Sequence, residues 1–256
     1  MVKKSNATKQ PRIVILVPFG SEDSSRIEIW EYIHKRLSDE FSYPIYTGAD
    51  QPESIDVFNI SLSRNLAAQK ADADKKWDIA IIHDADTIIN RQQILAGVDT
   101  VWKSGAVTYP FTERYELDRT GTEIFLSENN SAWQGKAKRH TGKQSLGGCV
   151  IVRRDLWDLV RGFDTGFKGW GHEDGAFAIA CGVLSLRGIK RIPGNSLHLE
   201  HTYSPSKNKD SPIYQANHAR IMHYVHATGQ NNPEELIKKL RDQSLSVDAD
   251  AGIKWQ

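Results

Sequence analysis

The first 110 residues alternate between short apolar runs and longer stretches with helical periodicity. Short runs bounded by Pro, Gly and Asp predict strands, whereas apolar residues spaced three and four apart predict helices. This alternation predicts an α/β fold with a mostly parallel, doubly wound sheet and right-handed crossovers. The expected strands are 12–17, 43–47, 77–82 and 106–109, and the expected helices are 26–37, 58–70 and 92–102.

The most apolar of these strands, Ile79 to Ile82, leads directly into Asp84-Ala85-Asp86. In an extended chain, Asp84 and Asp86 would point to the same side. Ligands of open α/β sheets bind at the carboxyl ends of the strands, and two carboxylates there suit a hard divalent cation that also binds phosphate oxygens. Taken alone, the acid pair is more typical of a polar turn, in which an aspartate caps the next helix, than of a metal site.

The regular alternation stops after residue 110. Residues 111–145 are polar and contain glycines and the basic cluster Lys136–His140. A stretch of this length with weak periodicity predicts a functional lid or a disordered loop. The basic cluster could contact phosphate or a polymeric acceptor, although such clusters are more often solvated surface. A strand is expected at 146–152, where Gly147 and Gly148 would allow close approach to the backbone.

Residues 162–174 combine four glycines, two phenylalanines, a tryptophan and two adjacent acids. Glu173 and Asp174 would begin a helix that continues over 176–184, where the helix dipole stabilises their ionised forms. Helix capping accounts for these acids but not for the Gly-Trp-Gly sequence before them. An exposed indole at Trp170 suits a platform on which a sugar ring stacks, with an acid beside it as general base.

Short strands at 189–192 and 196–199 lead into His198-Leu199-Glu200-His201. A lone histidine is more often structural than a ligand, but an imidazole here would complement a metal site made of two carboxylates. Two further helices are expected, at 215–229 with Ile221 and Val225 facing inward, and at 233–240.

Composition excludes several classes of protein. The 256 residues are 39% hydrophobic and 25% charged, as in ordinary soluble domains. The net charge of +1 gives no electrostatic footprint for nucleic acid or an anionic membrane. Cys149 and Cys181 are too few for a disulfide framework and are interpreted as buried thiols. No apolar run approaches the roughly 20 residues that span a bilayer, so we expect a cytoplasmic protein.

The order of the motifs resembles the nucleotide-sugar glycosyltransferases of GT-A fold. Over residues 12–225 the chain is most similar to the catalytic domain of the β-1,4-galactosyltransferase family, and similar elements occur in chondroitin-type and polypeptide N-acetylgalactosaminyl transferases. The motifs that carry the resemblance are Pro18-Phe19, Phe58-Asn59 with Asn65, Asp84-Ala85-Asp86, Gly147-Gly148, Gly162-Phe163-Asp164, Gly169-Trp170-Gly171-His172-Glu173-Asp174 and a late histidine.

The resemblance implies a GT-A (Rossmann-like) fold, with a mostly parallel central sheet flanked by helices and a small antiparallel portion on the acceptor side. It implies an inverting transfer of a sugar from a UDP-sugar donor to a hydroxyl of a carbohydrate or other acceptor. Mn²⁺, or Mg²⁺ in its place, would be held by Asp86 and a late histidine, with His201 preferred to His198. Asp84 would lie near the donor's ribose or sugar and could add a metal ligand.

The resemblance also assigns the remaining site residues. Asp174 would be the general base that deprotonates the acceptor hydroxyl, and Glu173 would bind the acceptor. Where the family has arginines, this chain has Gly20-Ser21-Glu22 and Ile60. Either Arg26 or Arg64 takes their place at the nucleotide, or the nucleotide is held differently. The other residues expected at the donor are Pro18, Phe19 and Phe58 at the uridine, Ala85, and Trp170 over the sugars.

The resemblance implies a single domain over most of the chain. A retaining transferase on the same scaffold stays open. So does a transferase acting on modified DNA bases, which would use the basic cluster but has the neutral net charge against it. A binding module without catalysis is the third alternative, and the retention of both acid pairs argues against it. The expected parts are a lead-in (1–11), a single GT-A domain (12–240) with a nucleotide-binding half (12–110), a loop or lid (111–145) and an acceptor and catalytic half (146–240), and a disordered tail (241–256).

Overall fold

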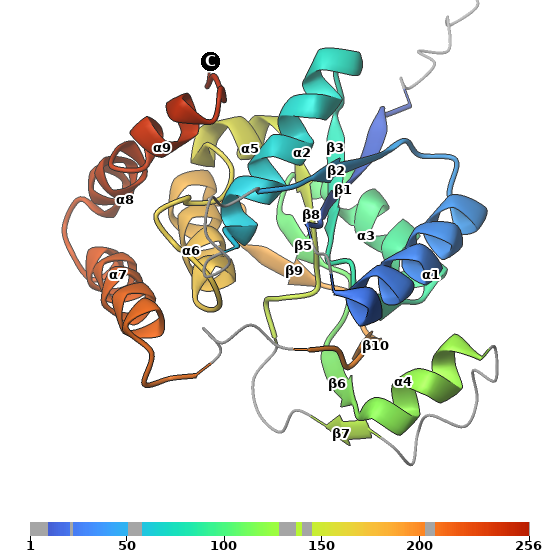
Figure 1. Cartoon of the computed structure of the whole chain (residues 1–256). Coiled ribbons are helices and arrows are strands. Elements are labelled where there is room, and N and C mark those ends of the chain that lie inside the picture. The colour runs from blue at the N-terminus through green and yellow to red at the C-terminus, as the bar shows by residue number, and fades with distance from the viewer. Residues whose placement is uncertain are drawn as a thin grey trace, which may run out of the picture.

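A computed structural model describes residues 10–20, 23–50, 58–127, 137–139, 145–202 and 208–255. The central feature of this part is a six-stranded sheet with strand order β2-β1-β3-β8-β5-β9 (Figure 1). All neighbours are parallel except β8, which runs antiparallel to both β3 and β5. The strands are β1 Ile13–Pro18, β2 Ile45–Gly48, β3 Ile79–His83, β5 Val107–Tyr109, β8 Cys149–Arg153 and β9 Ile189–Arg191.

The mostly parallel sheet is therefore confirmed. The antiparallel direction of β8 was not predicted, and it determines which residues lie at the candidate site. Cys149 at the start of β8 pairs with His83 at the end of β3. Because β8 is reversed, its first residues, rather than its last, lie at the edge where β3 ends. Gly147 and Gly148 consequently sit beside Asp84, whose backbone N–H donates to the carbonyl of Gly148 at 2.8 Å.

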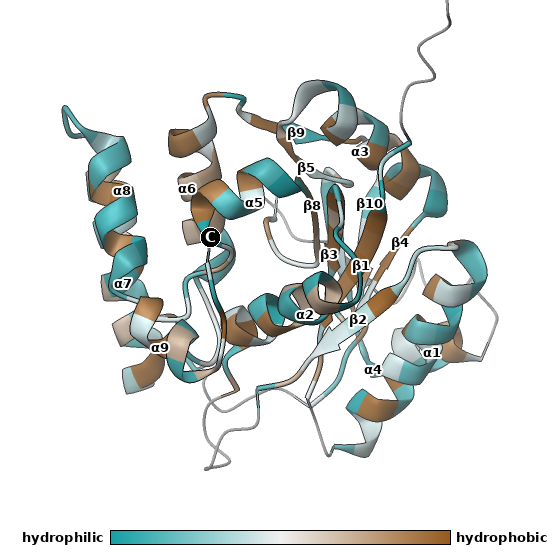
Figure 2. Cartoon of the chain, turned by 90° about the horizontal axis from the view of Figure 1, so that it is seen from above, coloured by the Kyte–Doolittle hydropathy of each residue, from teal (hydrophilic) through white to brown (hydrophobic). Residues whose placement is uncertain are grey.

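Helices cover both faces of the sheet, with α2, α5 and α6 over one face and α1 and α3 over the other (Figures 1 and 2). The central strands are brown in Figure 2 because β1, β3 and β8 bury apolar residues on both faces. The expected helices are confirmed, with ends shifted by a few residues. They are α1 Ser24–Glu40, α2 Ile60–Asp74, α3 Arg91–Ser104, α6 Glu173–Ser185, α7 Pro212–Thr228 and α8 Pro233–Asp242. A short helix, α5 Arg154–Val160, follows β8.

A smaller sheet with order β4-β10-β6-β7 lies at one end of the molecule. The pairings of β10 with β4 and of β6 with β7 are antiparallel, and that of β10 with β6 is parallel. The small sheet therefore ties the turn after β3 to the residues before His201. Its strands are β4 Thr87–Ile89, β6 Glu113–Leu117, β7 Ala137–Arg139 and β10 Asn195–His198.

The expected loop or lid over 111–145 is wrong for its first part, which contains β6 and helix α4, Arg119–Leu126. The side chain of Asp118 caps α4 by accepting from the N–H of Gly121 at 2.7 Å. Phe125 is buried in the core and packs edge-on against Tyr32 at 6.1 Å. These elements are held by partners distant in sequence, which local periodicity cannot indicate. Of the basic cluster, Lys136 and His140 lie outside the described residues, as does the lead-in 1–9, whereas 137–139 form β7.

The expected disordered tail is also wrong, because residues 241–255 pack back onto the domain. Arg241 is buried and donates to the carbonyls of Val160, Gly162 and Phe163. A further helix, α9 Leu245–Asp250, follows, and the indole of Trp255 donates to Asp248 at 2.8 Å.

In α7, Ile221 is buried as expected, whereas Val225 is 46% exposed and Tyr224 is buried in its place. Across the described part of the chain, no helix is long and apolar enough to cross a bilayer.

Candidate active site

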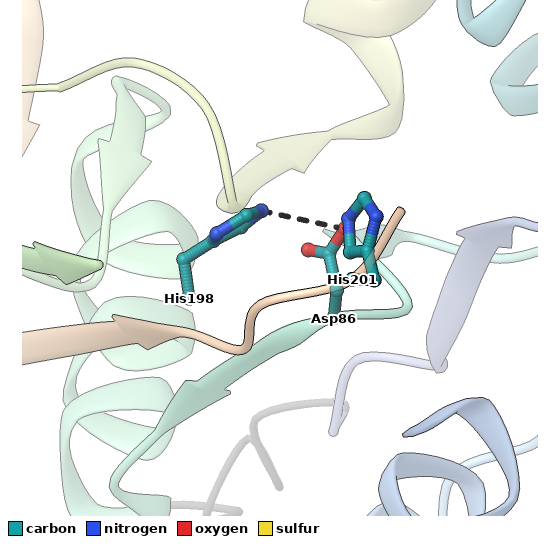
Figure 3. Close-up of side chains that lie close together, drawn as sticks. All are labelled: Asp86, His198 and His201. Carbon is teal, nitrogen blue, oxygen red and sulfur yellow. Dashed lines mark hydrogen bonds and ion pairs between the residues drawn. The ribbon is translucent and has the colours of Figure 1, made fainter. Parts of the chain in front are cut away.

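Three side chains from two distant segments meet beyond the carboxyl end of β3. Asp86 lies in the turn between β3 and β4, His198 ends β10 and His201 follows shortly after. Their ligand atoms lie within 4.8 Å of one another (Figure 3). His201 Nε2 lies 3.0 Å and His198 Nε2 3.6 Å from the Oδ2 atom of Asp86. The pairing of Thr87 with His198, and the hydrogen bond from Leu199 N–H to the Asp86 carbonyl, fix the three residues together.

This cluster has the chemistry of a divalent transition-metal site. One carboxylate and two imidazoles suit a divalent transition-metal ion better than Mg²⁺, which prefers oxygen ligands throughout. Burial alone would raise the pKa of Asp86, but His198 and His201 outweigh it and hold the pKa well below the usual carboxyl value. Asp86 is therefore ionised, as a metal ligand must be. Both histidines belong to the cluster, and His201 lies closer to Asp86 than His198 does.

Asp84 does not join the cluster. The chain turns after His83 instead of staying extended, and the N–H of Thr87 donates to the Asp84 carbonyl at 3.3 Å. The Asp84 carboxylate accepts from Arg64 Nη2 at 2.8 Å and from the Gly148 N–H at 3.1 Å. The expectation that both acids point the same way is therefore wrong, and the two acids have different partners.

Arg64 is a buried cation among three carboxylates. It is 2% exposed, and its Nη1 lies 2.8 Å from Asp174 Oδ1 and 3.6 Å from Glu173 Oε1. Burial would lower the pKa of Arg64, but Asp174, Asp84 and Glu173 outweigh burial and raise it. Both terminal nitrogens of Arg64 thus contact carboxylates of the protein, whereas a contact with the nucleotide was expected. Arg26, the other candidate, is half-buried in the first turn of α1.

Glu173 and Asp174 open helix α6, as expected. Burial, followed by repulsion from Asp174, raises the pKa of Glu173 to about 8. Burial also raises the pKa of Asp174, although Arg64 opposes the shift. A carboxyl group with a raised pKa is a stronger proton acceptor once ionised, as a general base requires.

Gly147 and Gly148 are needed because the acid and an arginine lie against them. A Cβ added to Gly147 would lie 2.9 Å from Asp174 Oδ2, and one added to Gly148 would lie 2.7 Å from Arg114 Nη1. Arg114 on β6 also donates to the Gly147 carbonyl at 3.0 Å. Sequence reasoning missed Arg114, because the expected loop gave no sign that it reaches this edge.

Comparison with known proteins shows what this chain is similar to. Residues 131–202, which include Trp170, Asp174 and both histidines, match the family described as the N-terminal domain of galactosyltransferase. The chain is 22% identical to human β-1,4-galactosyltransferase 4 over 217 residues, which cover 84% of this chain and 54% of that protein. It is 21% identical to the rat protein over 168 residues, covering 64% of this chain and 40% of that one.

A structural relative gives the fold. The catalytic domain of Drosophila β-1,4-galactosyltransferase 7, solved in complex with xylobiose, superimposes with a TM-score of 0.50 at 15% identity, covering 80% of this chain and 79% of that one. The chain has the GT-A glycosyltransferase fold and resembles the galactosyltransferase catalytic domain. It spans about half the length, or less, of the human and rat relatives.

In this galactosyltransferase-like domain, Trp170 is 41% exposed, in agreement with the expected platform. Its ring stacks on Tyr214 of α7, with centroids 5.6 Å apart and planes at 19°. The side-chain amide of Asn217 donates to the carbonyls of Lys168 and Trp170, which fixes the loop to α7. Tyr214 was not predicted, because no local motif links it to Trp170.

The residues expected around the uridine lie near the carboxyl end of β1. Pro18 ends that strand and pairs with Gly48, and Phe19 stacks on Trp30 with centroids 5.4 Å apart. The Phe58 carbonyl accepts from the Gly169 N–H at 3.2 Å, which joins this region to the Trp170 loop. Ala85 is buried between the two acids. Their contact with a nucleotide stays a prediction.

Proposed function

We propose that the chain is a metal-dependent glycosyltransferase that transfers a sugar from a UDP-sugar to an acceptor hydroxyl with inversion. The observation that carries the proposal is the convergence of Asp86, His198 and His201 within 4.8 Å at the sheet edge. The candidate base Asp174 lies at the same edge, because Arg64 forms ion pairs with both Asp84 and Asp174. A metal-ligand group and a base at one edge are the two components that such a transfer requires.

The ligands to test first come from a related protein. Drosophila β-1,4-galactosyltransferase 7 has been crystallised in a mutant form with manganese, UDP-Gal and xylobiose. In the present chain Asp86, His198 and His201 would hold the ion. When bound, such an ion neutralises the charge that develops on the leaving diphosphate.

The protein side chains have the remaining roles. Asp174 accepts the proton of the acceptor hydroxyl while the hydroxyl oxygen bonds to the anomeric carbon and the bond from that carbon to the diphosphate oxygen breaks. Glu173, one residue earlier, would orient the acceptor, and the exposed face of Trp170 would stack on a sugar ring. Since the acceptor attacks directly, no protein nucleophile is required, and the product has the inverted configuration.

The decisive experiment is calorimetry of UDP binding with Mn²⁺, with EDTA, and with the Asp86→Ala variant. We expect binding that weakens at least about tenfold when the ion or the Asp86 carboxylate is removed. Asp99→Ala is the matched control, because Asp99 is an exposed acid of α3 that pairs only with Lys103 among the described residues. UDP binding that is indifferent to the metal and to Asp86 would contradict the proposal. NMR of the product anomer tests inversion against retention.

A further inference from the structure

We propose that Arg64 is a positioning residue for the candidate base: its guanidinium holds one carboxylate oxygen of Asp174, ties it to Asp84 on the donor side, and leaves the second oxygen to an acceptor hydroxyl. This inference rests on the proposed function. It adds a role for a buried arginine that acts on the reaction through its contact with the candidate base Asp174.

The contacts of Arg64 make it a bridge between two parts of the site. Nη2 donates to Asp84 Oδ1 and Nη1 donates to Asp174 Oδ1, both at 2.8 Å. Asp84 follows β3 and Asp174 opens α6, so the bridge joins segments 90 residues apart in sequence. One planar guanidinium can hold two carboxylates in fixed directions, which the single ammonium of lysine cannot do.

The guanidinium of Arg64 is itself fixed by contacts with Phe163. The guanidinium lies over the ring of Phe163, with 4.4 Å from Cζ to the ring centroid, and that ring stacks on Phe177. The neighbouring Asn65 both donates to the carbonyl of Phe163 at 2.9 Å and accepts from its N–H at 2.9 Å. Arg64 therefore has little freedom to follow a displaced carboxylate, and Asp174 must conform to it.

The two oxygens of Asp174 are not equivalent. Oδ1 accepts from Arg64, whereas Oδ2 receives no hydrogen bond from the described residues and lies against Gly147, where a Cβ would be 2.9 Å away. The Asp174 side chain keeps 23% of its exposure. The acceptor proton is therefore expected at Oδ2.

Charge balance makes Arg64 the cation that controls this base. The described charged and titratable groups that act on Asp174 include Arg64 from α2, Asp84 after β3, Tyr109 of β5, Glu173 on the same helix and Arg114 from β6. Arg64 alone contacts Asp174 directly among the described cations, whereas Arg114 donates to a neighbouring carbonyl. Weakening the Arg64 contact leaves a half-buried carboxylate beside two other acids, which favours its protonated form.

The test is Arg64→Lys, read by ¹³C-carboxyl NMR titration of the metal-free protein, with the Asp174 signal assigned from Asp174→Asn. We expect the Asp174 midpoint to rise by about one pH unit, because the lysine cannot hold both acids. In transfer assays we expect kcat to fall about tenfold or more, while UDP affinity with Mn²⁺ changes less than about threefold. Arg241→Lys is the matched control: this arginine is equally buried but contacts the backbone of 160–163, so its loss should lower stability and leave the Asp174 midpoint unchanged.

An unchanged Asp174 midpoint in folded Arg64→Lys would overturn the inference. Should that variant not fold, the ¹⁵N guanidinium signals of Arg64 in the wild-type protein test the same contact, because they should shift with the Asp174 midpoint. Guanidinium signals that do not follow the titration of Asp174 would overturn the inference. A native chain that neither binds UDP nor transfers sugar would refute the proposed function. The titration would still decide whether Arg64 governs Asp174.

Discussion

At the residue scale, only some of the candidate site residues could be recognised from the sequence. Glu173, Asp174 and Trp170 could be selected from a local pattern with a chemical meaning, whereas Asp86 and His201 were selected through the family resemblance. Sequence reasoning could not find Arg114 or Tyr214, which reach the site from β6 and α7 through contacts between segments distant in the chain. The two glycines before β8 show the same limit: their pattern predicted close approach, and only the structure identifies what approaches.

Gly147→Ala should slow transfer without loss of donor binding. Its Cβ would lie 2.9 Å from Asp174 Oδ2, so the candidate base must shift. Misplacing a catalytic group by a fraction of an ångström to 1 Å costs up to about 100-fold in rate. The measurement is kcat together with calorimetric UDP affinity. Gly182→Ala, in the middle of α6 with nothing within 4 Å of its added Cβ, is the control and should keep full activity. A Gly147→Ala protein of normal rate would contradict the assignment of Asp174.

The pKa of Asp174 sets an expected acid limit to activity. Burial raises this pKa, and only the ionised carboxylate can accept the acceptor proton. Activity should therefore fall as the pH drops through the raised pKa, at a pH above the ordinary aspartate value of about 3.9. The measurement is kcat/KM for the acceptor against pH. An acid limb at or below the ordinary value, or an Asp174→Asn variant of undiminished rate, would show that another group is the base.

At the element scale, the helices were the most predictable part, because a polar residue that can cap the first turn precedes each of the first three in the sequence. Asp23 caps α1, Asn59 caps α2 and Asn90 caps α3 by accepting from N–H groups of the first turn. Strand direction was less predictable: an apolar run such as 149–153 has the same composition whichever way it runs. Strand β6 and helix α4 were missed because β6 pairs with β10, some 80 residues later.

Helix α6 ends in a way that favours a glycine. Its C-cap, Leu186, has φ +52° and is 85% exposed, so the side chain gives up little packing for a left-handed backbone. Leu186→Gly should raise the free energy of unfolding by roughly 0.5–1 kcal/mol, because glycine adopts this conformation without steric cost. Urea denaturation measures the change. Leu186→Ala keeps the backbone strain and should show no comparable gain; equal gains in both variants would refute the explanation.

At the scale of the whole molecule, one buried acid connects the site loop to the end of the chain. Asp164 accepts from Arg220 of α7, from Tyr224 at 2.7 Å and from Ser244 just before α9. Burial would raise the pKa of Asp164, but Arg241 and Arg220 outweigh it and lower it. The tail was expected to be disordered because its polar residues gave no sign of these partners.

Asp164→Asn should destabilise the fold by about 3 kcal/mol, since it leaves buried arginines without their anion. The wild-type contribution of Asp164 is present above the ordinary carboxyl pKa of about 3.9 and is lost as the pH falls through the lower, folded-state value. The difference between wild type and variant in urea denaturation should therefore shrink below about pH 4. Asp99→Asn on the surface of α3 should change stability by less than about 0.5 kcal/mol. A difference for Asp164 that is independent of pH would contradict this account.

The metal-ligand group also has a consequence for the chain as a polymer. Asp86 and His201 are 115 residues apart in sequence and 3.0 Å apart in space. The unfolded chain would have to close this very long loop before both ligands could reach one ion, so an ion would bind the folded chain far more tightly than the unfolded one. Folding and cofactor loading would then be a single linked equilibrium, in which the availability of the ion decides how long each molecule survives as well as how fast it works.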